Sequence, residues 1–185
     1  IRQKAELYPF TIRTLFIGGG TPSIFPAAEM DAILSCLHRQ FSFTDNAECT
    51  CECNPGTVTE AFLAVLKKHG INRLSFGAQA SQLHLLRLLG RIHTWEDVVS
   101  SVELARGMGW HNINLDLMLG LPGQTADDVR ETLLQALALQ PTHLSCYGLI
   151  VEEGTKMHAQ VQKGLWQLPD EETERAEYAM CQDIL

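Results

Sequence analysis

Small and polar residues follow several short apolar runs of this 185-residue sequence, and their chemistry suits the binding of a polar ligand. In the first group, Gly18-Gly19-Gly20-Thr21, the missing side chains let backbone amides and carbonyls approach a ligand closely. Such a turn suits a phosphate or an amino-acid head group. It lacks the third glycine of the dinucleotide fingerprint and the Gly-Lys-Ser/Thr of a P-loop. The spacing alone therefore favours a simple glycine turn over a phosphate site.

Glu52 is the second candidate, because it is a carboxylate in a segment where cysteine alternates with other residues. In a strand, Cys49, Cys51 and Cys53 share one face, whereas Thr50 and Glu52 share the other. Residues two apart on a strand are separated by about 7 Å, so three such cysteines are poorly placed to wrap one small metal cluster. We interpret the cysteines as buried beneath helices, with Glu52 facing the opposite side.

Gln79 and Asp116 interrupt apolar runs near the ends of two further predicted strands. A polar side chain in such a place is costly unless it has a hydrogen-bonding partner, and the hydroxyls of a sugar are suitable partners. The alternatives are a turn residue for Gln79 and a cap of the following loop for Asp116. Arg91 could bridge to a carboxylate in the same site, or it is a surface arginine near a helix end.

Composition excludes several classes of function. The net charge of −8 without a cluster of lysines and arginines argues against nucleic acid or an anionic membrane as partner. No apolar run approaches the roughly 20 residues that span a bilayer. The seven histidines lack metal-ligand spacing, and no serine or cysteine has a nucleophile-elbow context, which argues against a zinc hydrolase or a serine hydrolase. The acidic run 170–177 is interpreted as a solvated helix face, and the six cysteines as thiols of a cytoplasmic protein.

The elements that must position these residues alternate between strands and helices, a pattern typical of βα units around a parallel sheet. Hydroxyl and carboxylate residues at capping spacing mark helix starts at Thr57 with Glu60, Thr94 with Asp97 and Thr125 with Asp128. In parallel α/β folds, ligands bind at the carboxyl ends of strands. The five predicted strands are Thr11–Gly18, Ala47–Asn54, Arg73–Gln79, Asn112–Leu119 and His143–Leu149.

Taken together, the motifs resemble the radical S-adenosylmethionine (SAM) family, in the branch of oxygen-independent coproporphyrinogen III oxidases and HemW-like heme chaperones. The resemblance covers almost the whole chain, with the motifs in the expected order. They are Phe16-Ile-Gly-Gly-Gly-Thr-Pro-Ser23, Glu52-Cys-Asn-Pro-Gly-Thr57, Asn72-Arg-Leu-Ser-Phe-Gly-Ala-Gln79, Leu89-Gly-Arg-Ile-His93, Asn114-Leu-Asp-Leu-Met-Leu-Gly-Leu-Pro-Gly-Gln-Thr125 and Glu152-Glu-Gly-Thr155.

The resemblance implies an α/β fold, a partial (β/α) TIM-like barrel whose five strands correspond to strands two to six of a six-stranded parallel core. Residues 1–185 would be a piece of this core domain, with the first strand upstream and a C-terminal domain outside. By the same likeness, Gly18, Gly19, Gly20 and Thr21 hold the methionyl amino group of SAM. Glu52 and Arg91 organise its carboxylate end, and Gln79 and Asp116 bind its ribose hydroxyls.

The sequence departs from this family in its cysteines. Members hold a 4Fe-4S cluster with a Cys-x-x-x-Cys-x-x-Cys motif, and that spacing does not occur in the 185 residues. The cluster ligands are therefore expected outside the chain, and the chain alone is expected to generate no 5′-deoxyadenosyl radical. A sheet edge left open where the first strand belongs predicts pairing of two copies into a homodimer.

Three functions stay open at this point. Heme binding and transfer by a HemW-like chaperone fits the Glu52-Cys-Asn-Pro-Gly-Thr57 and Leu89-Gly-Arg-Ile-His93 motifs best. The second alternative is oxidative decarboxylation of coproporphyrinogen to protoporphyrinogen. The third is a non-enzymatic α/β binding module. The first two predict SAM, a 4Fe-4S cluster and a heme or porphyrin as ligands.

Overall fold

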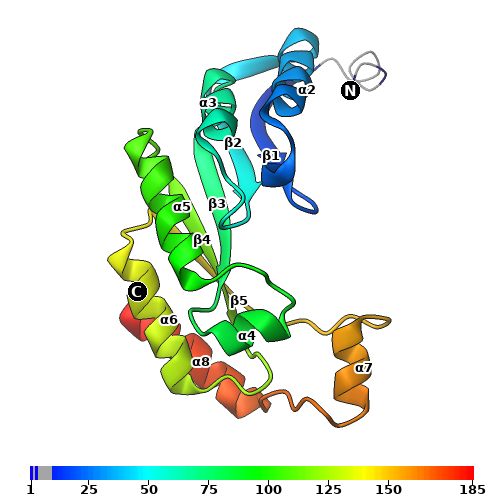
Figure 1. Cartoon of the computed structure of the whole chain (residues 1–185), viewed down its shortest axis with the longest axis vertical. Helices are drawn as coiled ribbons and strands as arrows, with labels where there is room; N and C mark the ends of the chain where they lie inside the picture. Colours follow the sequence, from blue (N-terminus) through cyan, green and yellow to red (C-terminus); the bar gives the residue numbers. More distant parts are fainter. Residues whose placement is uncertain (2, 4–9) are drawn as a thin grey trace.

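A curled sheet of five parallel strands forms the centre of the fold (Figure 1). The computed structural model describes residues 1, 3 and 10–185. The strands lie side by side in sequence order, and all four neighbouring pairs are parallel. This arrangement confirms the predicted α/β half-barrel. The strands are β1 Thr11–Ile17, β2 Ser42–Cys53, β3 Arg73–Gln79, β4 Ile113–Leu119 and β5 His143–Gly148.

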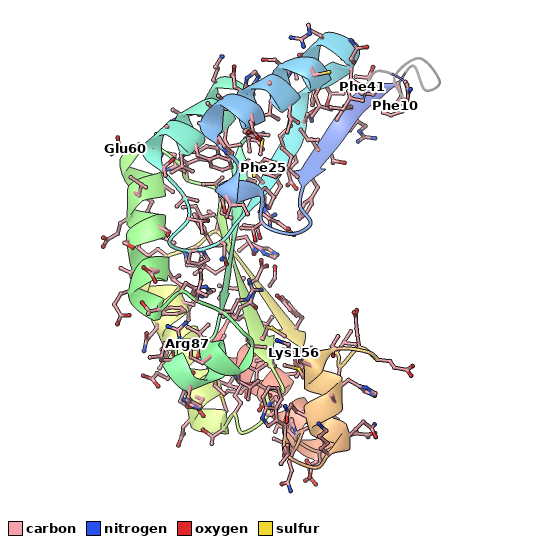
Figure 2. The ribbon with its side chains drawn as sticks, turned by 45° about the vertical axis from the view of Figure 1, so that its right-hand side comes forward. Phe10, Phe25, Phe41, Glu60, Arg87 and Lys156 are labelled. Carbon is pink, nitrogen blue, oxygen red and sulfur yellow. The ribbon has the colours of Figure 1, made fainter. Side chains whose placement is uncertain are left out.

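One layer of helices covers the outer face of the sheet, and the ribbon in Figure 2 is accordingly C-shaped with these helices along its outside. They are α2 Ala27–Gln40, α3 Glu60–Lys68, α5 Trp95–Gly107, α6 Ala126–Ala138 and α8 Glu171–Ile184. The main apolar core fills the space between this layer and the sheet. Three short helices follow the carboxyl ends of strands β1, β3 and β5, namely η1 Pro22–Ile24, α4 Leu83–Leu88 and α7 Lys156–Gln162.

The cysteines of β2 belong to this core. Cys49, Cys51 and Cys53 are at most 4 % exposed and pack among the apolar side chains beneath the helices. Glu52 lies on the other face of the strand, where its side chain remains partly exposed. The alternation predicted from the sequence is thus confirmed, because one face of β2 is needed for the core.

Strand β2 begins at Ser42 rather than at the predicted Ala47. Its first part pairs with β1 alone, whereas pairing with β3 begins at Thr50. Before Thr50, the side chain of Asn72 bonds to the backbone of β2 where a neighbouring strand otherwise would. It accepts a hydrogen bond from the Cys49 amide at 2.9 Å and donates one to the Ala47 carbonyl at 2.8 Å. This first part of β2 is polar and lacks an alternating apolar pattern, so the sequence did not predict it as a strand.

Two of the three predicted helix starts are confirmed. Complete capping boxes precede α5, from Thr94 and Asp97, and α6, from Thr125 and Asp128. The start predicted at Thr57 is wrong, because Thr59 caps α3 by accepting from the Phe62 amide. Thr57 instead donates to the Asn54 carbonyl at 2.7 Å within the turn after β2.

Helix α8 corrects the interpretation of the acidic run 170–177 as a solvated face. Its start is exposed, with Asp170 as the cap, but Glu177 is only 1 % exposed. Glu177 Oε2 accepts a hydrogen bond from the Gly120 amide at 2.9 Å, and Oε1 is buried without a partner. Burial raises the pKa of this carboxyl above its usual range. Glu177 is buried because it lies one helical turn before Cys181, whose side chain belongs to the core.

Both outer strands leave one edge open in the described part of the chain, since β1 and β5 each have a single strand neighbour. Homodimer formation along β1 stays a prediction. Among residues 1, 3 and 10–185, no helix is long and apolar enough to cross a bilayer.

Replacing the Glu177 carboxylate by a neutral amide should change how stability depends on pH. The folded-state pKa of Glu177 is raised, so the charged form is disfavoured by folding and its cost is present at high pH. This cost disappears as pH falls through the folded-state pKa toward the unfolded value. Urea unfolding gives the free energy of unfolding of Glu177→Gln minus that of wild type. We expect this difference to be more favourable at pH 8 than at pH 4, by on the order of 1 kcal/mol.

The matched control is Glu103→Gln, which neutralises an exposed glutamate on α5. Its effect should stay within about 0.5 kcal/mol at either pH. A stability difference for Glu177→Gln that is the same at pH 4 and pH 8 would contradict the assignment of a buried charge cost.

Candidate functional site

A pocket with about 470 Å³ of open space, part of it continuous with solvent, lies at the carboxyl ends of the five strands. Six of the eight predicted site residues line it, and Gly18 and Gly19 precede one of them in the same turn. The parallel sheet thus brings the predicted residues together. The lining residues are Gly20, Thr21, Pro22, Glu52, Cys53, Asn54, Ser75, Gly77, Gln79, Arg91, Asp116 and Tyr147.

The glycine turn after β1 is held against the end of β2. A Cβ atom at Gly18 would stand 2.8 Å from the Glu52 carboxylate and 2.7 Å from the ring of Phe16, so a larger residue would displace both side chains. Gly19 and Gly20 have φ values of 84° and 64°, in the region that glycine adopts at little cost. The Gly19 amide donates to Glu52 Oε2 at 3.1 Å. One side of the pocket is therefore a tight turn with the carboxylate beside it.

A chain of hydrogen bonds ties the following 3₁₀ turn, η1, to the loop after β2. Ser23 and Thr57 share a bond of 2.6 Å between their hydroxyls, and the Asn54 amide donates to the Ser23 hydroxyl at 2.9 Å. Arg91 Nη1 donates to Asn54 Oδ1 at 3.4 Å. The guanidinium thus reaches the pocket as predicted, although its hydrogen-bonding partner is this amide rather than a carboxylate.

Gln79 is 3 % exposed and has a φ of 66°, a left-handed conformation that is rare for a residue with a side chain. The ladder between β3 and β4 shifts register between Phe76 and Gln79, and this irregularity turns the backbone. The amide folds over Gly77, where a Cβ would stand 2.9 Å from Gln79 Nε2. Tyr147 donates its hydroxyl hydrogen to Gln79 Oε1 at 3.1 Å.

Asp116 is fixed by a buried polar network rather than by the following loop. Its Oδ1 accepts from Asn114 Nδ2 at 2.8 Å, and its Oδ2 accepts from the Ser75 hydroxyl at 3.1 Å. Asn114 also donates to Ser75 at 2.7 Å, while its Oδ1 is bonded to His143 Nδ1 and the Ser145 hydroxyl. The carboxylate keeps acceptor sites in addition to these two bonds.

Sequence reasoning missed Tyr147, Ser75, Gly77 and Asn114, of which period-two alternation could have found the last three. Side chains two apart on a strand share a face. Asn114 shares a face with Asp116, and Ser75 and Gly77 extend the face that ends at Gln79. Tyr147 alternates with the half-buried Cys146 of β5, but nothing local distinguishes it from a surface tyrosine. Burial, and after it the charge of Asp116, raises the pKa of Tyr147, so its hydroxyl is a neutral donor at pH 7.

The cysteines of the described residues do not fit an iron–sulfur cluster. Cys53 lines the pocket, but its sulfur is turned into the core, where the hydrogen bond to Cys51 and burial hold the pKa of its thiol well above the usual range. A cluster requires thiolates. Within residues 1, 3 and 10–185, no three His, Cys, Asp or Glu side chains stand together in a way that could hold a metal ion.

The curled parallel sheet with a polar pocket at its carboxyl edge defines a partial (β/α) barrel, and comparison with known proteins places it in a family. The Radical SAM superfamily model matches residues 1–136, and the chain belongs to this superfamily. Its relatives include the heme chaperone HemW of Bacillus subtilis (strain 168), which is 40% identical over 168 residues. The match covers 90% of this chain and 44% of that protein.

Two further comparisons agree. The oxygen-independent coproporphyrinogen-III oxidase-like protein HemZ of Bacillus subtilis is 36% identical over 148 residues, covering 79% of this chain and 30% of HemZ. The solved structure of coproporphyrinogen III oxidase (HemN) from Escherichia coli, described as a radical SAM enzyme, superimposes with a TM-score of 0.83 at 27% identity. That match covers 97% of this chain and 41% of HemN. The chain spans less than half the length of these relatives.

A methyl group added at Gly18 should disturb the fold at the pocket. Gly18→Ala would place Cβ within 2.8 Å of both Phe16 and Glu52, so both side chains must move. Both atoms are at the ends of flexible side chains, and Phe16 is 61% exposed, so we expect the free energy of unfolding to fall by about 0.5–1.5 kcal/mol, the cost of an unfavourable side-chain rotamer. Chemical denaturation measures this change.

Gly107→Ala is the matched control, since a Cβ there meets no atom within 4 Å and the residue ends helix α5. It should leave stability unchanged or raise it slightly. Equal effects of the two substitutions would refute the close approach at Gly18.

Proposed function

We propose that the pocket binds SAM through the residues predicted from the sequence. Gly18, Gly19, Gly20 and Thr21 would receive the methionyl amino group, with Glu52 and Arg91 near the carboxylate end. Gln79 and Asp116 would bind the ribose hydroxyls. The observation that carries the proposal is the convergence, in one pocket, of residues from separate strands whose polarities suit these groups.

The geometry of the pocket supports each part of this assignment. The Gly19–Gly20 turn offers backbone groups beside open space, since a Cβ at either position would meet no atom within 4 Å. The ammonium and carboxylate groups of the methionyl end are on one carbon atom, so Arg91 supplies positive charge for the carboxylate while Glu52 supplies negative charge for the ammonium group beside it. Asp116 is an acceptor with both oxygens already oriented, and a sugar hydroxyl would donate to it.

When bound to a 4Fe-4S cluster, SAM supplies a 5′-deoxyadenosyl radical in this superfamily. The described cysteines do not fit that cluster, so we place its ligands outside these residues. In this proposal, residues 1–185 contribute part of a barrel domain, and a cluster-binding segment and a C-terminal domain belong to the remaining length seen in the relatives. The role of the residues described here is to bind and orient SAM.

For the protein as a whole we propose heme binding and transfer. This function is supported by the HemW relatives, of which the Bacillus subtilis protein is 40% identical. Coproporphyrinogen decarboxylation is the less favoured alternative, because the matched HemN structure is more distant at 27% identity. Location in the cytoplasm is part of the proposal, since all six cysteines are free thiols. Pairing of two copies along the open edge of β1 is a further part.

Loss of one charge in the pocket should weaken SAM binding. Asp116→Asn removes the negative charge and replaces one acceptor oxygen by an NH2 donor, which would face Asn114 Nδ2 or the Ser75 hydroxyl, so it weakens the sugar contact and disturbs the network. We expect the Kd for SAM to rise roughly 10- to 150-fold, the range for a hydrogen bond to a charged group. Isothermal titration calorimetry measures it, with Asp183→Asn on the exposed side of α8 as the control. Equal affinities of wild type and Asp116→Asn would refute the proposed site.

Heme handling and porphyrinogen oxidation make opposite predictions for the protein at its full natural length. A heme chaperone should shift the absorbance of added heme and form no protoporphyrinogen from coproporphyrinogen when SAM and a reductant are present. The oxidase should form protoporphyrinogen. Accumulation of protoporphyrinogen, or an unchanged heme spectrum, would overturn the chaperone proposal.

A further inference from the structure

The geometry points to Tyr147 as a positioning residue for sugar recognition: its hydroxyl holds the Gln79 amide oxygen, so that the N–H groups of Gln79 face the ligand. This inference rests on the proposed binding of SAM in the pocket. It concerns a residue that no sequence motif indicated, and it specifies the polarity of the contact that Gln79 makes.

The side chain of Gln79 has two ends of opposite polarity, and the structure engages one of them. Its Oε1 accepts from the Tyr147 hydroxyl at 3.1 Å. The other end, Nε2, lies over Gly77, where the absence of a Cβ leaves it room on the pocket side. With its oxygen held toward Tyr147, the Gln79 amide turns its two N–H donors toward a ligand in the pocket.

The backbone of Gln79 is equally constrained. Its φ of 66° follows the register shift between β3 and β4, and such strain persists only where the surroundings hold it. His93 helps to do so, because its Nε2 lies 3.4 Å from the carbonyl of Ala78, the residue before Gln79. With the backbone fixed in this way, rotation of the side chain is the freedom that remains, and Tyr147 restricts it.

Asp116 supplies the complementary group. Both of its oxygens are acceptors, and both are oriented by Asn114 and Ser75. A sugar hydroxyl between Asp116 and Gln79 would donate its hydrogen to the carboxylate and accept a hydrogen from Gln79 Nε2. This pair distinguishes a hydroxyl from a hydrogen atom at the same position of the sugar, because a deoxy sugar would leave both groups without a partner.

Tyr147 comes from β5, so this contact joins two strands that are separated by β4 in the sheet. The ring is partly exposed, at 39%, and its substitution by phenylalanine preserves the packed part of the side chain. The functional consequence of losing the hydroxyl is therefore separable from a loss of folding.

The test compares two ligands and four variants in the protein at its full natural length. The ligands are S-adenosylhomocysteine, which needs no reductant and is not cleaved at a sulfonium, and its 2′-deoxyribose counterpart. The variants are Tyr147→Phe, Gln79→Ala, their double variant and Gln79→Glu, which keeps an acceptor for Tyr147 but removes the donor. Calorimetry gives each Kd, and thermal unfolding confirms that each variant is folded.

We expect Tyr147→Phe to weaken binding of the ribose ligand roughly 2- to 12-fold, the range for one hydrogen bond, and to leave the deoxyribose ligand within about 2-fold. In the Gln79→Ala background, the same substitution should have no further effect on the ribose ligand, because Tyr147 acts through Gln79. Gln79→Glu should reduce the preference for ribose, and Asp116 accounts for the part that remains. The matched control, Tyr178→Phe, removes a hydroxyl that accepts from the Gly148 amide and should show no coupling to Gln79→Ala.

The inference is overturned if the effect of Tyr147→Phe adds to that of Gln79→Ala. If Tyr147→Phe weakens the ribose and 2′-deoxyribose ligands equally, the 3′-deoxyribose counterpart is measured, because the contacted group is then the 3′-hydroxyl. Equal weakening of the ribose ligand and of both deoxyribose ligands overturns the inference. If wild-type protein binds neither ribose nor deoxyribose ligand, the proposed SAM site itself fails. Binding by wild type without an effect of Tyr147→Phe leaves the site standing and removes only the role of Tyr147.

Discussion

The parallel pairing of the five strands is the constraint on which the rest of the structure depends. Because every strand runs the same way, all carboxyl ends meet at one edge, and side chains alternate between the helix-covered face and the concave face. On β2 this alternation buries Cys51 and Cys53 beneath the helices and turns Glu52 toward the Gly18–Gly20 turn. A slip of one residue in its register would place the carboxylate in the core.

Helix starts and strand faces could be predicted from the sequence where the deciding forces are local. The capping boxes at Thr94 and Thr125 are complete within four residues, and the alternation on β2 needs only the strand itself. Thr57 and Thr59 show the limit of such reasoning. Both precede the same helix, but Thr59 is the cap, whereas the Thr57 hydroxyl bonds to Ser23 of η1, a residue distant in the sequence.

The unpredicted features arise from contacts between distant parts of the chain. Glu177 lies in a run of charges that locally suggests solvent, yet the packing of α8 brings it to the Gly120 amide. The left-handed backbone of Gln79 depends on an irregular pairing with β4, which strand propensity does not encode. Tyr147 enters the pocket from β5, at the far side of β4 from Gln79. Each requires knowledge of the register, and register follows from the whole sheet.

These long-range contacts also determine how the pocket meets a ligand. Asn114 uses both amide hydrogens and its oxygen in bonds to four neighbours, so the orientation of Asp116 is set by folding and not by ligand binding. Gln79 is similarly held on its backbone and at its side-chain oxygen. A ligand that matches these groups need not order them, and the entropy of ordering is a main cost of association. Contacts formed on folding offset the backbone strain at Gln79. The donors and acceptors of the pocket are therefore in place before any ligand enters.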